Sequence, residues 1–114
     1  MRKRSVTCDA WDVVAVPFPF TDRLAQKRRP ALIISPKNFN RYGHSLMAMI
    51  TSSGQPWPGD SPLRDLNSAG LSSACVVRLK LFTLDNRLII RQIGRLSAND
   101  RSKVAAALKL VLPF

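Results

Sequence analysis

The chain has 114 residues, 46% of them hydrophobic, which is enough for one folded domain with an ordinary core and too apolar for intrinsic disorder. Lys and Arg number 18 against seven acidic residues, which gives a formal net charge of +11. A charge of this size predicts an anionic partner, most often nucleic acid, with an acidic protein as the next candidate.

The same composition excludes several classes of protein. No apolar run approaches the ~20 residues needed to cross a bilayer, so we expect no membrane segment. The basic residues at 1–5 are followed by no apolar stretch, so we expect no secretory signal. Two cysteines and one histidine supply neither a disulfide framework nor a metal site. We therefore expect no metal, no cofactor and a cytoplasmic location with reduced thiols.

Five β-strands are predicted from runs of β-branched and aromatic residues, at residues 11–16, 29–35, 45–51, 73–84 and 87–96. Polar, turn-forming segments separate them, including a basic lead-in at 1–10, loops at 21–28 and 36–43, and a Gly- and Pro-rich loop at 52–62. Asp85 and Asn86 are expected to form a tight turn with positive φ between the last two strands.

A C-terminal helix is predicted at about residues 98–112. Ser97 is a favourable N-cap, and Asp100, three residues later, completes a weak capping box. Apolar residues recur at helical spacing on one face, namely Val104, Ala107, Leu108, Val111 and Leu112. Because strands precede a single helix without βαβ alternation, we predict one mainly β (α+β) domain over residues 1–114. It is expected to be a small, bent antiparallel sheet or barrel with the helix packed on it.

The basic residues gather on the predicted strands. Lys27, Arg28 and Arg29 form a run that enters the second strand. Alternation places Arg78 and Lys80 on one face of the fourth strand, and Arg87, Arg91 and Arg95 follow on the fifth. A solvated sheet face is one interpretation for any single residue. For the group, a groove that binds a polyanion is favoured, because five like charges on neighbouring strands repel one another.

Hydroxyl groups gather at the end of the third strand. Thr51, Ser52 and Ser53 either bind phosphate oxygens or cap a turn. Trp57 lies between two prolines in the loop that follows, where it either stacks a base, anchors a protein partner or covers the core.

Seven short segments of the chain together resemble a known family. They are residues 12–22 (DVVAVPFPFTD), 28–35 (RRPALIIS), 38–41 (NFNR), 50–53 (ITSS), 76–79 (VVRL), 82–85 (FTLD) and 93–97 (IGRLS). In this order, and over nearly the whole chain, they resemble the MazF/PemK (Kid) toxin family. The resemblance implies an SH3-like β-barrel of the CcdB/PemK type with a C-terminal helix, forming a symmetric homodimer.

The same resemblance implies an activity. Members of the family are typically the toxin half of a type II toxin–antitoxin pair, and they cleave single-stranded RNA, usually mRNA, at short sequences without a metal. An antitoxin with an acidic C-terminal segment blocks them. Some toxins with the related CcdB barrel inhibit DNA gyrase instead, although no residue here points to that target.

The resemblance also assigns roles to individual residues. Arg29 matches the family's catalytic arginine and Thr51 its catalytic threonine. RNA-binding positions are expected at Lys27, Arg28, Ser52, Ser53, Arg78 and Lys80. A guanidinium binds two phosphate oxygens at once and stays charged, so it suits the phosphorane formed when the ribose 2′-OH attacks.

Two departures from the family pattern affect the expected chemistry. The loop at 21–28 holds no histidine, and Lys80 stands where some relatives carry an acid. Asp22 or Asp85 is expected to substitute only if the fold brings it near the site. The alternative function is therefore a catalytically weak or inactive module of the same fold that binds RNA or protein.

Overall fold

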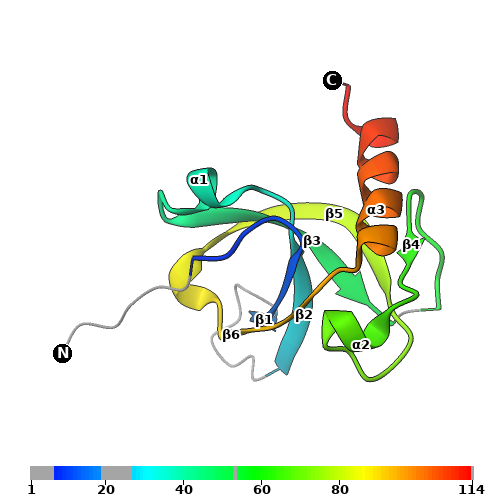
Figure 1. Ribbon diagram of the computed structural model, residues 1–114, viewed down its shortest axis with the longest axis horizontal. Coiled ribbons are helices and arrows are strands. Elements are labelled where there is room, and N and C mark those ends of the chain that lie inside the picture. Colours follow the sequence, from blue (N-terminus) through cyan, green and yellow to red (C-terminus); the bar gives the residue numbers. More distant parts are fainter. Residues whose placement is uncertain (1–6, 19–26, 53, 114) are drawn as a thin grey trace.

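The computed structural model describes residues 7–18, 27–52 and 54–113. Its centre is an antiparallel six-stranded sheet that curls on itself (Figure 1). The strands are β1 (Asp12–Phe18), β2 (Lys27–Ile33), β3 (His44–Thr51), β4 (Ser61–Pro62), β5 (Val76–Asp85) and β6 (Arg91–Arg95). They are arranged in the order β4-β5-β3-β2-β1-β6. The expected small antiparallel sheet with a C-terminal helix is confirmed.

Four helical segments connect or follow the strands: α1 (Lys37–Asn40), α2 (Leu66–Ala69), the 3-10 helix η1 (Asn86–Leu88) and α3 (Ala98–Val111). Only α3 was expected, because the others are too short to show a helical repeat. The tight turn predicted at Asp85 and Asn86 is wrong. Asp85 instead accepts a hydrogen bond from the backbone N–H of Arg87 (2.9 Å) and caps η1.

The two faces of the curled sheet carry separate groups of buried residues. Alternating side chains of β1, β2 and β3 face α3 and form one core with it, represented by Val13, Leu32, Ala48 and Val104. The intervening residues form a second core, which includes Val14, Ala31 and Met47. A sheet buried on both faces explains why the strands lack a simple apolar–polar alternation in sequence.

Two glycines allow α2 to close against β6. Gly70 has a φ of +75°, and a Cβ built on it would lie 1.8 Å from the carbonyl oxygen of Ile93. A Cβ on Gly94 would lie 2.2 Å from the carbonyl carbon of Ala69. No side chain fits in either place, so the backbones of these two segments are in direct contact.

The C-terminal helix begins as predicted and ends within one residue of the predicted position. Ser97 accepts a hydrogen bond from the backbone N–H of Asp100 (3.2 Å), which confirms the N-cap. The Asp100 carboxylate is buried and accepts from the backbone N–H groups of Arg64 and Asp65, so it joins α3 to the segment before α2. Val104 is buried, but Val111 is 47% exposed, because the last turn extends beyond the sheet.

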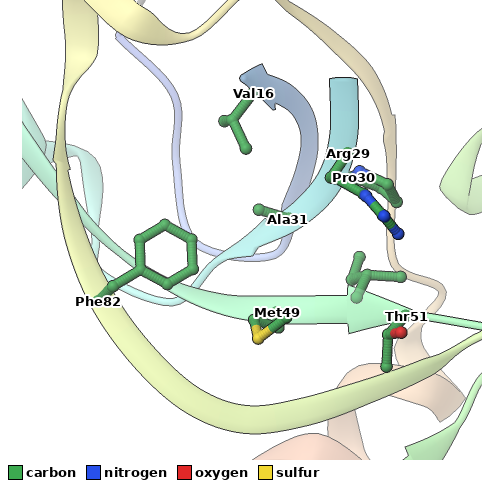
Figure 2. Close-up of a pocket in the computed structure, with 8 residues that line it drawn as sticks. Val16, Arg29, Pro30, Ala31, Met49, Thr51 and Phe82 are labelled. Carbon is green, nitrogen blue, oxygen red and sulfur yellow. The ribbon is translucent and has the colours of Figure 1, made fainter. Parts of the chain in front are cut away.

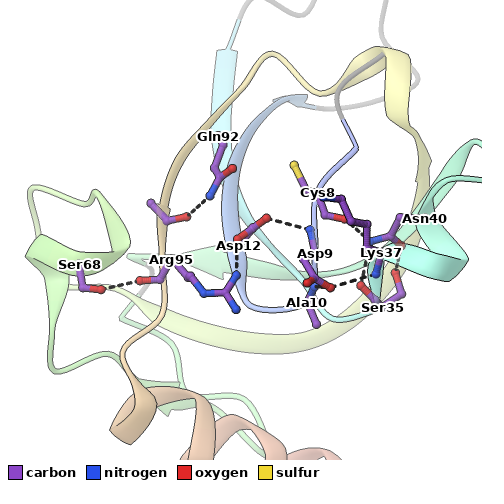
Figure 3. A network of polar contacts seen from close by, with 11 residues as sticks. Cys8, Asp9, Ala10, Asp12, Ser35, Lys37, Asn40, Ser68, Gln92 and Arg95 are labelled. Carbon is purple, nitrogen blue, oxygen red and sulfur yellow. Dashed lines mark hydrogen bonds and ion pairs between the residues drawn. The ribbon is translucent and has the colours of Figure 1, made fainter. Parts of the chain in front are cut away.

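The N-terminal lead-in is structured from at least Cys8 onward, contrary to the expected tail at 1–10. Cys8 is buried, which raises the pKa of its thiol to about 11. Its carbonyl accepts from the Asn40 side chain, and Asp9 accepts from the backbone N–H of Lys37 (Figure 3). Asp12 in turn binds Arg95 at 2.7 Å, which ties this segment to β6.

Candidate nucleic-acid interface

A groove of about 600 Å³ opens where β2 and β3 diverge. Lys27, Arg28 and Arg29 line it from β2, Thr51 and Ser52 from the end of β3, and Arg91 from β6. Residues 70–75 close the groove, because they run from α2, which packs against β6, to β5, which pairs with β3.

Arg29 and Thr51 both line this groove. The β2–β3 ladder ends at the pair of Ala31 with Met49, and Arg29 and Thr51 each lie two residues beyond that pair, on the two strands that border the groove. Both residues also line a smaller cavity of about 80 Å³, whose walls include Met49 and Phe82. Figure 2 shows the Arg29 side chain on β2 directed toward the end of β3 that carries Thr51. The sequence expectation that these two residues belong together is therefore supported by their positions.

The acidic residues neutralise arginines elsewhere on the molecule. Arg78 binds Asp60 at 2.9 Å, Arg87 binds Asp85 at 2.7 Å, and Arg95 binds Asp12 at 2.7 Å. The Arg87 guanidinium holds the pKa of Asp85 at about 2. None of the described residues that line the groove is acidic. Four cationic side chains therefore border it without a carboxylate in its lining, which favours a polyanionic ligand.

The predicted continuous basic face on two neighbouring strands is wrong. β5 and β6 lie far apart in the sheet order, because β6 pairs with β1. Arg87 belongs to η1 rather than to a strand. Arg78 and Lys80 also do not follow the simple two-residue alternation of a regular strand, since the register between β3 and β5 shifts between Ala48 and Met49. The cationic residues that line the groove come from β2 and β6 instead.

Three of the six predicted RNA-binding positions line the groove. Lys27, Arg28 and Ser52 line the groove together with Arg29 and Thr51. Ser53 lies outside the described residues. Two further positions, Arg78 and Lys80, lie on β5 outside the groove lining. Arg78 is 7% exposed and held by Asp60, and Lys80 lies over the ring of Trp57.

The fold does not bring Asp85 to the site. Asp85 pairs with His44 at one end of β3, whereas Thr51 is at the other end, where it pairs with Val76. The condition under which Asp85 could substitute for the acid missing at Lys80 is therefore not met. Asp22 lies outside the described residues.

Several groove residues were not selected from the sequence as site residues. Arg91 and the segment Gly70–Leu71–Ser72–Ser73 come from parts of the chain that are distant from Arg29 in sequence. Arg91 was recognised only as one member of a charged strand. No local pattern marks residues 70–73, because their place in the groove depends on the contact between α2 and β6.

Neither a cluster of metal ligands nor a membrane-spanning helix occurs among the described residues. Within 7–18, 27–52 and 54–113, no three His, Cys, Asp or Glu side chains gather as metal ligands would. In the same part of the chain, none of the helices has the length and apolar character needed to span a membrane.

Comparisons with known proteins agree with the fold. A family model described as PemK-like, MazF-like toxin of type II toxin–antitoxin system matches residues 9–112. MazF from Deinococcus radiodurans is similar in structure, with a TM-score of 0.73 and 25% identity over 96% of this chain and 99% of that one. A sequence search of curated proteins finds no match.

Two other solved structures are similar in fold. One is the MazE–MazF complex from Deinococcus radiodurans, with a TM-score of 0.75 and 24% identity over 96% of this chain and 98% of that one. The other is an endoribonuclease in complex with its cognate antitoxin from Mycobacterial species, with a TM-score of 0.73 and 17% identity over 94% and 98%. Because the family model covers nearly the whole chain, this protein belongs to the PemK-like, MazF-like toxin family of type II toxin–antitoxin systems.

Proposed function

We propose that this protein is a toxin that cleaves single-stranded mRNA without a metal and so inhibits translation and growth. The observation that carries the proposal is the shared groove of Arg29 and Thr51, which is bordered by cations and has no carboxylate among its described lining residues. Endoribonuclease activity is general in the family to which the chain belongs.

The chemistry follows from the residues in the groove. RNA carries its own nucleophile, the ribose 2′-OH, whose attack on the adjacent phosphorus gives a 2′,3′-cyclic phosphate and releases the 5′-oxygen. Negative charge builds up on the non-bridging oxygens during this step. The Arg29 guanidinium stabilises that charge, and the Thr51 hydroxyl donates a hydrogen bond to the same phosphate. Lys27, Arg28 and Ser52 hold the neighbouring backbone.

The proposed partners follow from charge and from family membership. A net charge of +11 and a groove lined by cations suit RNA and also an antitoxin with an acidic C-terminal segment. Similar toxins have been solved in complex with an antitoxin. We propose that this protein acts in the cytoplasm as a homodimer and that its antitoxin covers the groove.

Cleavage in the presence of EDTA tests the proposal. The wild-type protein should cut a single-stranded RNA and leave a 2′,3′-cyclic phosphate. Arg29→Ala should lower the rate by about 10²–10³-fold, the cost of losing one donor to the developing charge. Arg41→Ala is the matched control, because Arg41 is exposed beside α1 and outside the groove. Equal cleavage by Arg29→Ala and the wild type would overturn the proposal.

A second candidate function is binding without cleavage. The observation that favours it is the lack of a carboxylate among the described groove residues, since general-base catalysis then has no acidic side chain there. A steep salt dependence of RNA affinity without any cleavage product would support this alternative.

A further inference from the structure

A rigid turn presents Trp57 at the edge of the sheet beside β5. Pro58 and Gly59 are its central residues, and Gly59 has a φ of +84°, as a type II turn requires at that position. The backbone N–H of Asp60 donates to the carbonyl of Trp57 (3.1 Å), and the N–H of Trp57 donates to Asp60 Oδ2 (3.0 Å). The turn is thus closed by two hydrogen bonds between the same two residues.

Arg78 fastens this turn to the sheet. Its Nε donates to Asp60 Oδ1 (3.1 Å), one terminal nitrogen donates to Asp60 Oδ2 (2.9 Å), and the same nitrogen donates to the carbonyl of Gln55. The two side chains are only 9% and 17% exposed. The Arg78 guanidinium lowers the pKa of Asp60, so the carboxylate stays ionised and the turn stays anchored near neutral pH.

The ring that this anchor holds in place is itself accessible. Trp57 is 42% exposed, although indole is among the side chains that most favour burial. The Lys80 ammonium lies 4.2 Å from the ring centroid, in cation–π contact. An exposed indole, fixed by its neighbours and paired with a cation, loses little conformational entropy when a ligand binds.

We propose that Trp57 and Lys80 form a stacking platform for one nucleobase of the bound RNA, with Lys80 facing the adjacent phosphate. This inference rests on the proposed function and names a subsite outside the scissile bond. Aromatic faces stack any base, and a neighbouring lysine suits the phosphate of the same nucleotide. A net charge of +11 favours an anionic occupant over a second copy of the chain.

The platform lies within reach of a strand bound in the groove. Ser52 lines the groove, and Trp57 follows it by five residues, so the two Cα atoms are at most about 18 Å apart. A single strand that extends from the Arg29 and Thr51 site along the segment after β3 therefore needs only a few nucleotides to reach the platform. The subsite raises affinity and sets a preferred binding register without touching the reacting atoms.

Binding measured against abasic RNA tests this platform. The probe is a short single-stranded RNA that the wild-type protein binds, together with a series that lacks one base at a time. Removal of one particular base should weaken wild-type binding by about tenfold, the effect of one lost base–aromatic stack. Trp57→Ala should weaken binding of the intact RNA equally and should lose nothing further with that abasic RNA. Tyr42→Ala is the control, because Tyr42 is 84% exposed but belongs to the segment after α1.

Fluorescence provides a second measurement that does not depend on a truncated side chain. The chain has two tryptophans, so Trp11→Phe leaves Trp57 as the sole indole. RNA should quench its emission, and the abasic RNA identified above should not. Unchanged RNA affinity in Trp57→Ala would overturn the platform, and so would a loss confined to an acidic protein partner. These measurements record binding and not cleavage. A protein that binds RNA through Trp57 but does not cut it would therefore contradict the proposed function and leave the platform standing.

Discussion

Arg29 on β2 and Thr51 on β3 line the same groove and the same small cavity. The antiparallel ladder between these strands ends at the pair of Ala31 with Met49, and each of the two residues lies two positions beyond that pair on its own strand. A guanidinium and a hydroxyl that line one groove can contact the same phosphate, which is the geometric basis of the proposed cleavage.

Thr51→Val removes the hydroxyl while keeping the shape of the side chain. If the hydroxyl donates to the scissile phosphate, single-turnover cleavage should slow by about 10²-fold, and RNA affinity should change little. Thr51→Ser, which restores the hydroxyl, should recover most of the rate. A Thr51→Val protein that cleaves at the wild-type rate would remove Thr51 from the reaction.

Asp22→Asn tests the source of the general base. The other six acidic residues are all engaged by hydrogen bonds or ion pairs, namely Asp9, Asp12, Asp60, Asp65, Asp85 and Asp100. We therefore expect Asp22→Asn to lower the cleavage rate by about 10²-fold and to remove the acidic limb of its pH profile. Asp65→Asn serves as the control, because Asp65 caps α2. An unchanged pH profile would show that Asp22 is not the base.

The sequence predicted the positions of the strands better than it predicted which strands pair with each other. Alternation and β-branched residues identify β1, β2 and β3 within one or two residues, because those signals are local. The pairing of β6 with β1 depends on contacts between residues more than 70 positions apart, such as Asp12 with Arg95. Local pattern carries no information on such pairs, so the predicted basic face was assembled from the wrong strands.

Gly70→Ala should destabilise the fold. The new Cβ would collide with the carbonyl of Ile93 and would force a positive φ on a residue that disfavours it. We expect a loss of at least about 2 kcal/mol in the free energy of unfolding. Gly54→Ala is the matched control, because a Cβ there meets nothing within 4 Å. Denaturant unfolding of the two variants measures the difference, and equal stability would refute the close contact between α2 and β6.

Asp60→Asn should change stability in a pH-dependent way. The pKa of Asp60 is lowered in the folded state, chiefly by its hydrogen bond to Arg78, so its ionised form stabilises the fold above its usual pKa of 3.8. That stabilisation is lost as the pH falls through the lowered pKa. Thermal unfolding should therefore separate wild type from Asp60→Asn near neutral pH and bring them together in strong acid. A pH-independent difference would contradict this assignment.

The sequence predicted those groove residues that have suitable side chains and are adjacent to one another in the chain. Lys27, Arg28 and Arg29 are consecutive, and Thr51 and Ser52 are adjacent, so each group appears as a unit in the sequence. Arg78 shows the limit of such reasoning. Its type and position suit RNA binding, but Asp60, 18 residues away, binds it instead and so anchors the turn that holds Trp57.

The central claim is that the RNA attacks itself while Arg29 and Thr51 hold the scissile phosphate. The most direct measurement uses a single-stranded RNA with one 2′-deoxy nucleotide at the mapped cleavage position, incubated with wild-type protein in EDTA. Our account predicts unchanged binding and no cut at that position, because the nucleophile is missing. Cleavage at the deoxy position at the rate of the all-ribose strand would contradict it.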